Sequence, residues 1–172
     1  HKDVLPRYVK TVLQIIIVVL FVITAVYLTR YFVGDYLHSK AVSASKRGEW
    51  ASALSYYDKV NKLNPTYPMS RYFTANIYLD RWEAGDEIKA ERAFKELWKL
   101  APNYVQSKYL AGYMYARVFE KNMMLKEEFI KKGRKPEDIE KVTREAMSAF
   151  DKAVSSFNEY VMIDPVFPFS YY

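Results

Sequence analysis

The chain has 172 residues, no cysteine and a formal net charge of +6, of which +3 remains from Tyr31 onward, where 22 basic residues stand against 19 acidic ones. The absence of cysteine excludes disulfides, thiolate metal sites and thiol catalysis. The small net charge lacks the dominant basic face of nucleic-acid-binding proteins. With only 5 glycines and 7 prolines, the composition favours helices over a turn-rich fold.

An uncharged apolar segment comes first. Residues 11–29, TVLQIIIVVLFVITAVYLT, carry no charge and are flanked by Lys10 and Arg30. A helix of this length spans about 30 Å, the thickness of bilayer hydrocarbon. A buried core helix is usually shorter, and a signal peptide has an apolar run of about 7–15 residues followed by a small-residue cleavage site. We therefore predict a transmembrane helix over residues 11–30 after a basic flank at residues 1–10.

The charges around this segment indicate its orientation. Lys2, Arg7 and Lys10 precede it, and Arg30 and Lys40 follow it closely. The positive-inside rule slightly favours an N-terminus on the inside. The prediction is a single-pass protein of a plasma or inner membrane, with its remaining residues on the extracytoplasmic side.

After the segment, three prolines close similar stretches of sequence: Pro65, Pro102 and Pro165. Small residues stand twelve positions before these prolines, aromatic residues eight before and aliphatic residues two before: Ala53, Ala90 and Ala153; Tyr57, Phe94 and Phe157; Leu63, Leu100 and Ile163. Steps of four residues fall on one helical face, and proline ends a helix. We therefore expect three helices that end near these prolines.

A second set of helices is expected before these three. One column holds small residues, and aromatic residues follow three positions later in two of the three copies: Ala41, Ala75 and Gly112; Ala44, Tyr78 and Tyr115. A small residue lets two helices approach closely, and an aromatic neighbour fills the space beside it. Each helix of this set should therefore pair with the one that follows.

This helix–turn–helix pattern resembles the tetratricopeptide repeat family, whose unit is about 34 residues long. The resemblance covers residues 36–165 and implies an all-α fold, in which the N-terminal transmembrane helix is followed by a solenoid of helical hairpins. Repeats are expected at residues 35–65, 66–102 and 103–165. An aromatic tail follows at residues 166–172.

The third repeat is longer than the family pattern. Tyr115 and Ala153 are 38 positions apart, where the pattern expects about 9. The surplus has a helical composition that breaks at Gly133 and restarts at Pro136, where proline and the acids after it are helix-start signals. We predict two overlong helices forming a hairpin with KKGRKP at its apex. The expected seam residues are Phe119, Met123, Ile130, Ile139, Val142, Phe150 and Val154.

The sequence offers no set of catalytic residues. Its two histidines, His1 and His38, are too few and too far apart for a usual metal site. Phosphate-binding loops and hydrolase motifs are absent, and acidic pairs such as Glu127–Glu128 are expected on solvated helix faces. We expect no enzyme activity, no cofactor, no metal and no nucleic-acid partner.

The family resemblance implies that the first helix of each repeat lines a groove for peptides or partner helices. The columns facing it hold His38, Val42 and Ser45, then Met69, Tyr72, Asn76 and Leu79, then Gln106, Tyr109, Tyr113 and Arg117. Tyrosine offers rigid contact area, although the three tyrosines could instead pack as core. The family's carboxylate clamp is not expected, because its columns carry His38, Val42, Phe73, Gln106 and Leu110.

Two further surfaces stay open to interpretation. The basic apex of the long hairpin, Lys131, Lys132, Arg134 and Lys135, is either a solvated turn or a contact for anionic lipid or an acidic partner. The aromatic tail either covers the end of the last repeat or docks on a partner.

These features leave two functions. One is a membrane-anchored scaffold or assembly factor that binds proteins in the repeat groove. The alternative is a permanent accessory subunit of a larger membrane complex, of respiratory, photosynthetic or secretion type. In that case Gln14, Thr24 and Thr29 could contact neighbouring transmembrane helices.

Overall fold

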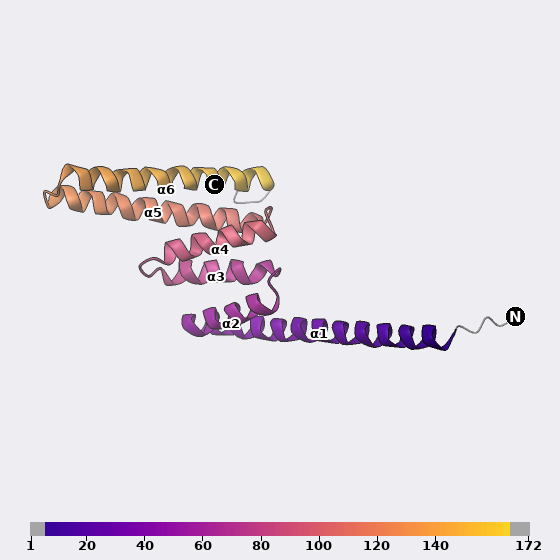
Figure 1. Cartoon of the computed structure of the whole chain (residues 1–172). Coiled ribbons are helices and arrows are strands. Elements are labelled where there is room, and N and C mark those ends of the chain that lie inside the picture. Colours follow the sequence, from indigo (N-terminus) through magenta and orange to yellow (C-terminus); the bar gives the residue numbers. More distant parts are fainter. Residues whose placement is uncertain (1–5, 166–172) are drawn as a thin grey trace. The chain divides into compact units, whose positions relative to one another are not determined.

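The structure, a computed structural model, describes residues 6–165, so the predicted aromatic tail at residues 166–172 lies outside the described residues. The described part is all-α, with six helices and no strand (Figure 1). It forms two compact units, which divide between Tyr67 and Pro68.

The first unit consists of two helices, α1 (Arg7–Lys46) and α2 (Trp50–Leu63). α1 runs without a break from the predicted span into the first predicted repeat, and α2 folds back along its C-terminal part (Figure 1). By length and composition alone, α1 is apolar enough to cross a membrane. α1 and α2 pack together, and the buried residues are Ala41 and Ala44 on α1 and Ala53, Tyr57 and Val60 on α2.

Arg30 joins the two helices at the other end of α2. Its guanidinium donates hydrogen bonds to the carbonyl oxygens of Leu63 at 3.1 Å and Lys62 at 3.4 Å. The last carbonyls of a helix have no partner within the helix, and a cation there also interacts favourably with the helix dipole. The first cation after the apolar segment therefore caps α2.

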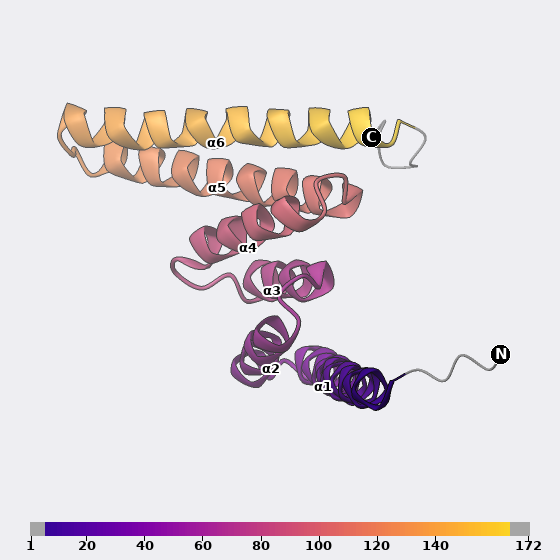
Figure 2. The same cartoon turned by 45° about the vertical axis from the view of Figure 1, so that its right-hand side comes forward.

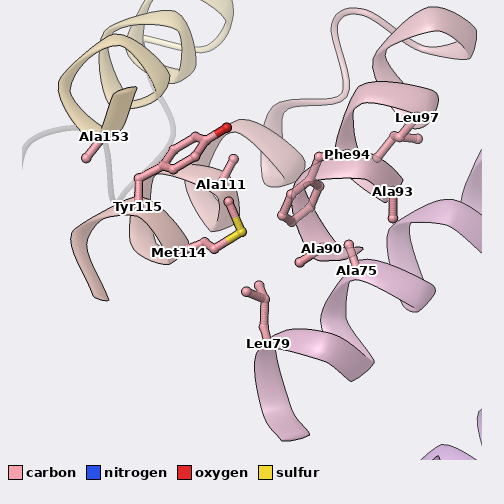
Figure 3. Packing of buried hydrophobic residues seen from close by; sticks show 10 residues of the cluster. All are labelled: Ala75, Leu79, Ala90, Ala93, Phe94, Leu97, Ala111, Met114, Tyr115 and Ala153. Atoms are coloured by element: carbon pink, nitrogen blue, oxygen red, sulfur yellow. The ribbon is translucent and has the colours of Figure 1, made fainter. Parts of the chain in front are cut away.

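The second unit consists of two helical hairpins, α3 (Pro68–Arg81) with α4 (Asp86–Leu100), and α5 (Val105–Lys131) with α6 (Pro136–Ile163). α4 packs against α5, and α5 and α6 lie side by side over their whole length (Figure 2). The core joins all four helices through Ala75 and Leu79, Ala90, Ala93, Phe94 and Leu97, Ala111, Met114 and Tyr115, and Ala153 (Figure 3). The small residues expected twelve positions before each proline are buried, which confirms that face of the repeat pattern.

The long hairpin has the helix ends that the sequence predicts. α5 ends at Lys131, and α6 begins at Pro136 with Glu137 and Asp138 in its first turn. Gly133 between them has a φ of +61°, a left-handed conformation that glycine adopts without steric cost. The two overlong helices are confirmed.

The seam of this hairpin differs from the prediction. α6 buries Val142, Ala146, Ala149, Ala153, Ser156 and Tyr160, whereas Ile130, Phe150 and Val154 are 55%, 45% and 43% exposed. Ile130 and Val154 were therefore wrong as seam residues and Phe150 lies only at the edge of the seam, because alanines let two helices approach closely and larger residues then lie beside the contact. Phe150 meets Phe119 there, with ring centroids 5.6 Å apart.

Candidate functional site

The predicted groove residues of the second unit lie on α3 and α5, which are packed together at their starts. Tyr104, the residue before α5, places its ring edge-to-face on Tyr72 of α3 with a centroid distance of 5.1 Å. Its hydroxyl donates to the sulfur of Met69 at 3.9 Å. Burial raises the pKa of the Tyr104 hydroxyl. Met69 and Tyr72 are therefore packing residues at this end.

Arg117 holds the other end of the α3–α5 contact. Its Nη1 donates to the carbonyl oxygen of Leu79 at 2.9 Å, near the C-terminus of α3. The guanidinium carbon lies 3.7 Å from the ring centroid of Trp82 and 5.9 Å from that of Tyr113. Leu79 itself is buried in the core. Arg117 is thus a bridging residue, and Leu79 does not face a groove.

Three of the predicted residues form an open surface on α5, which we call the tyrosine face: Gln106, Tyr109 and Tyr113. All three are exposed, Tyr109 by 38% and Tyr113 by 49%. The Tyr109 ring is held by Phe157 and Tyr160 of α6, at centroid distances of 6.0 and 5.5 Å. Both open interpretations of the tyrosines therefore apply in part, since Tyr72 packs on Tyr104 while Tyr109 and Tyr113 are partly exposed. Asn76 is half-buried.

The groove residues predicted for the first repeat, His38, Val42 and Ser45, belong to the first unit and are half-buried. The His38 ring packs against Tyr57 and Tyr67 at centroid distances of 5.7 and 5.4 Å. Burial lowers the pKa of this imidazole, an effect that Asp35 opposes. His38 is therefore a packing residue of its unit.

The basic apex is exposed. Lys132 forms an ion pair with Glu128 one turn earlier, and the Arg134 guanidinium lies 5.8 Å from the ring centroid of Phe129. The structure thus gives two of the four cations local partners. Within residues 6–165, no group of three histidine, aspartate or glutamate side chains is placed to hold a metal ion.

The sequence did not indicate a cavity in this unit. A cavity of about 450 Å³ is lined by α4, α5 and α6. Its floor includes Met114 and Tyr115, and its rim carries two ion pairs, Glu87–Lys121 at 3.1 Å and Glu91–Lys152 at 3.3 Å. The only sequence signal was the pair of acids one turn apart on α4, which identifies no partner by itself.

The electrostatics of this rim favour paired charges. Burial opposes ionisation of Glu91, but Lys95 and Lys152 outweigh it and lower the pKa of the carboxyl. Burial raises the pKa of the neighbouring Tyr115 hydroxyl. Glu91 is thus ion-paired and the Tyr115 hydroxyl is neutral, an arrangement suited to contact with another molecule.

Comparison with solved structures shows a likeness in fold. A Bacteroides ovatus protein, described as a candidate protein-binding protein, superposes with a TM-score of 0.58 at 16% identity over 78% of this chain. The chain spans 66% of that protein, slightly less than two thirds. MamA of Desulfovibrio magneticus, from residue 41 to its end, gives a TM-score of 0.48 at 17% identity, covering 77% of this chain and 76% of its own. No protein-family model and no curated protein matches the chain. The first likeness and the six helices fit a tetratricopeptide-like fold.

Proposed function

We propose that this chain is a membrane-anchored scaffold that binds other proteins through the tyrosine face of α5. The observation that carries the proposal is a pair of partly exposed tyrosines one helical turn apart. Tyr109 is held by aromatic rings of α6, and Tyr113 lies beside Arg117. Rings held in this way provide contact area at little cost in side-chain entropy, which is why tyrosine is frequent at binding hot spots.

The face also suggests the kind of partner. Gln106 offers both a hydrogen-bond donor and an acceptor, as a peptide backbone requires. The guanidinium of Arg117 is engaged with a carbonyl and an indole ring, so a carboxylate clamp is not its role. A peptide segment or helix with apolar side chains is the partner that this surface fits.

The anchor is the second part of the proposal. α1 has the length and apolar composition of a membrane span, and its flanking charges favour an inside N-terminus. The scaffold would then act at the extracytoplasmic surface of a plasma or inner membrane. As a fold analogy only, the Bacteroides ovatus protein that shares this fold is also described as a candidate for protein binding.

The alternative, a permanent subunit of a larger membrane complex, has weaker support from the span. The hydroxyls of Thr24 and Thr29 donate to the carbonyls of Leu20 and Ala25 in their own helix, both at 2.8 Å. They thus satisfy their hydrogen bonds without a neighbouring helix. Gel filtration in mild detergent separates the two functions, because a free 20.3 kDa chain argues against a permanent complex.

The experiment is affinity capture from membranes with the full chain. Tyr109→Ala with Tyr113→Ala should weaken partner capture by about tenfold or more, as expected for hot-spot residues. Because Tyr109 also packs on α6, Tyr113→Glu is the second variant, and its thermal unfolding should match that of the parent chain. The control is Met124→Ala, an exposed change on the same helix. Unchanged capture by both tyrosine variants would refute the proposal.

A further inference from the structure

One side of α6 carries an apolar stripe. Phe150, Val154, Phe157 and Val161 follow one another at steps of four, three and four residues, which places them on a single helical face. Phe150 and Val154 are exposed, whereas Phe157 and Val161 are half-buried. A partly exposed apolar stripe of this length is unusual on a surface that faces water.

The residues of α4 at the same distances before their closing proline contact the next hairpin. Counted back from the closing prolines, the stripe corresponds to four residues of α4: Glu87, Glu91, Phe94 and Trp98. Glu87 pairs with Lys121 of α5 at 3.1 Å, and Glu91 pairs with Lys152 of α6 at 3.3 Å. Nε1 of Trp98 donates to the Ser107 hydroxyl at 2.9 Å. On α4, then, this face receives the following hairpin.

The residues after each closing proline also repeat. Residues 65–72 read PTYPMSRY, residues 102–109 read PNYVQSKY and residues 165–172 read PVFPFSYY. All three have an aromatic residue two positions after the proline, serine five positions after it and tyrosine seven positions after it. The first and sixth positions after the proline vary.

In the two described copies this pattern begins a helix. α3 starts at Pro68 and α5 at Val105, three positions after the closing proline in both cases. The shared serines, Ser70 and Ser107, are fully buried. The Ser107 hydroxyl donates to the carbonyl of Tyr104 at 2.6 Å while it accepts the Trp98 hydrogen bond. In the second copy, two of the shared positions, Tyr104 and Ser107, thus link the start of α5 to Trp98 of α4.

We propose that residues 165–172 begin a further helix, which docks on the C-terminal end of the α6 stripe as α5 docks on α4. Pro168 takes the first helical position, where proline is favoured, and Ser170 lies opposite Val161. Residues 168–172 match Val105–Tyr109, so they cover Phe157 and Val161 but not Phe150. The C-terminal part of the stripe, Phe157 and Val161, is then an internal packing surface of this chain, and this inference does not depend on the proposed function.

The test is amide hydrogen exchange of the full chain in detergent micelles, followed for the last turns of α6, residues 157–163. Phe167→Ala with Tyr172→Ala removes two rings at shared positions. The control, Val166→Ala with Tyr171→Ala, removes one ring and one small apolar side chain at the two variable positions. We expect the first pair to speed exchange by about fivefold or more, since local opening limits it, and the control pair to change it by less than about twofold. A chain ending at Pro165 sets the largest possible effect.

Three outcomes would overturn the proposal. If the chain ending at Pro165 exchanges like the parent, the end of α6 needs no cover. If both double variants act equally, the tail covers α6 without the register that the repeat implies. If protection rises with protein concentration, a second copy of the chain, and not residues 165–172, occupies the stripe.

Discussion

Asp86 shows how one residue organises the loop between α3 and α4. Its carboxylate is fully buried and accepts hydrogen bonds from the Arg81 guanidinium at 2.7 and 2.8 Å and from the backbone N–H of Glu83 at 3.0 Å. These bonds, led by that of Arg81, lower the pKa of Asp86 from 3.8 to about 2, against the effect of burial. The ionised form therefore stabilises the folded chain.

Asp86→Asn should lower the free energy of unfolding by about 2–4 kcal/mol at pH 7, because Arg81 loses a buried charged partner. The contribution of the ionised group is fully present above the unfolded pKa of 3.8 and is lost as pH falls toward about 2. The difference between parent and variant in urea unfolding should thus shrink between pH 4 and pH 2. A difference that stays constant over that range would contradict this account.

His38 predicts a pH effect of the same sign in a higher pH range. Burial lowers its pKa below 6.5, so the unfolded chain binds more protons and the folded state loses stability as pH falls through 6.5. The loss cannot exceed about 1.4 kcal/mol per pH unit for one group. His38→Phe keeps ring contacts with Tyr57 and Tyr67, and should remove this pH dependence from thermal unfolding between pH 7.5 and 5.5. An unchanged pH dependence would assign it to other groups.

At the scale of helices, Gly112 decides how closely α5 and α6 approach. A Cβ at this position would lie 2.7 Å from Cε1 of Phe157, closer than the two atoms can pack. Small residues on both helices, Gly112 and Ala153 among them, make the contact close. This is why Val154 lies outside the seam and Phe150 at its edge, although hydrophobicity alone would have placed both within it.

Gly112→Ala should therefore destabilise the second unit by about 1–3 kcal/mol through overpacking, although alanine favours a helix by about 1 kcal/mol. Phe157→Leu in the same chain should recover part of the loss, which a double-mutant cycle in denaturant measures. Gly34→Ala is the control, since nothing lies within 4 Å of its Cβ position. Equal effects of the two glycine substitutions would remove the packing explanation.

At the scale of the whole molecule, the apex of the long hairpin reports the side of the membrane. Residues 131–135 are exposed and lie between two helices, and exposed loop tips are preferred sites of proteolysis. Trypsin added to sealed, right-side-out vesicles should cut at Lys131–Lys135 if the second unit is extracytoplasmic. Cleavage only after the vesicles are opened would reverse the proposed orientation.

Much of the helix pattern was readable from the sequence because its signals are local. The break at Gly133, the restart at Pro136 and the uncharged apolar run each act through the backbone or through nearby side chains. The spacing of small and aromatic residues before the prolines likewise predicted which helix faces are buried. A further local signal is the pattern after Pro65 and Pro102, which also follows Pro165.

Within the candidate site, the role of each residue depended on tertiary contacts. Tyr72 and Tyr113 have the same side chain in equivalent helices, yet Tyr72 packs on Tyr104 and Tyr113 stays half exposed. Arg117 reaches a carbonyl of α3 that is 38 residues away in the chain. The sequence alone determined where helices begin, end and carry apolar faces. Only the packed structure decided which of those residues remain open to a partner, because exposure depends on neighbours that are distant in the sequence.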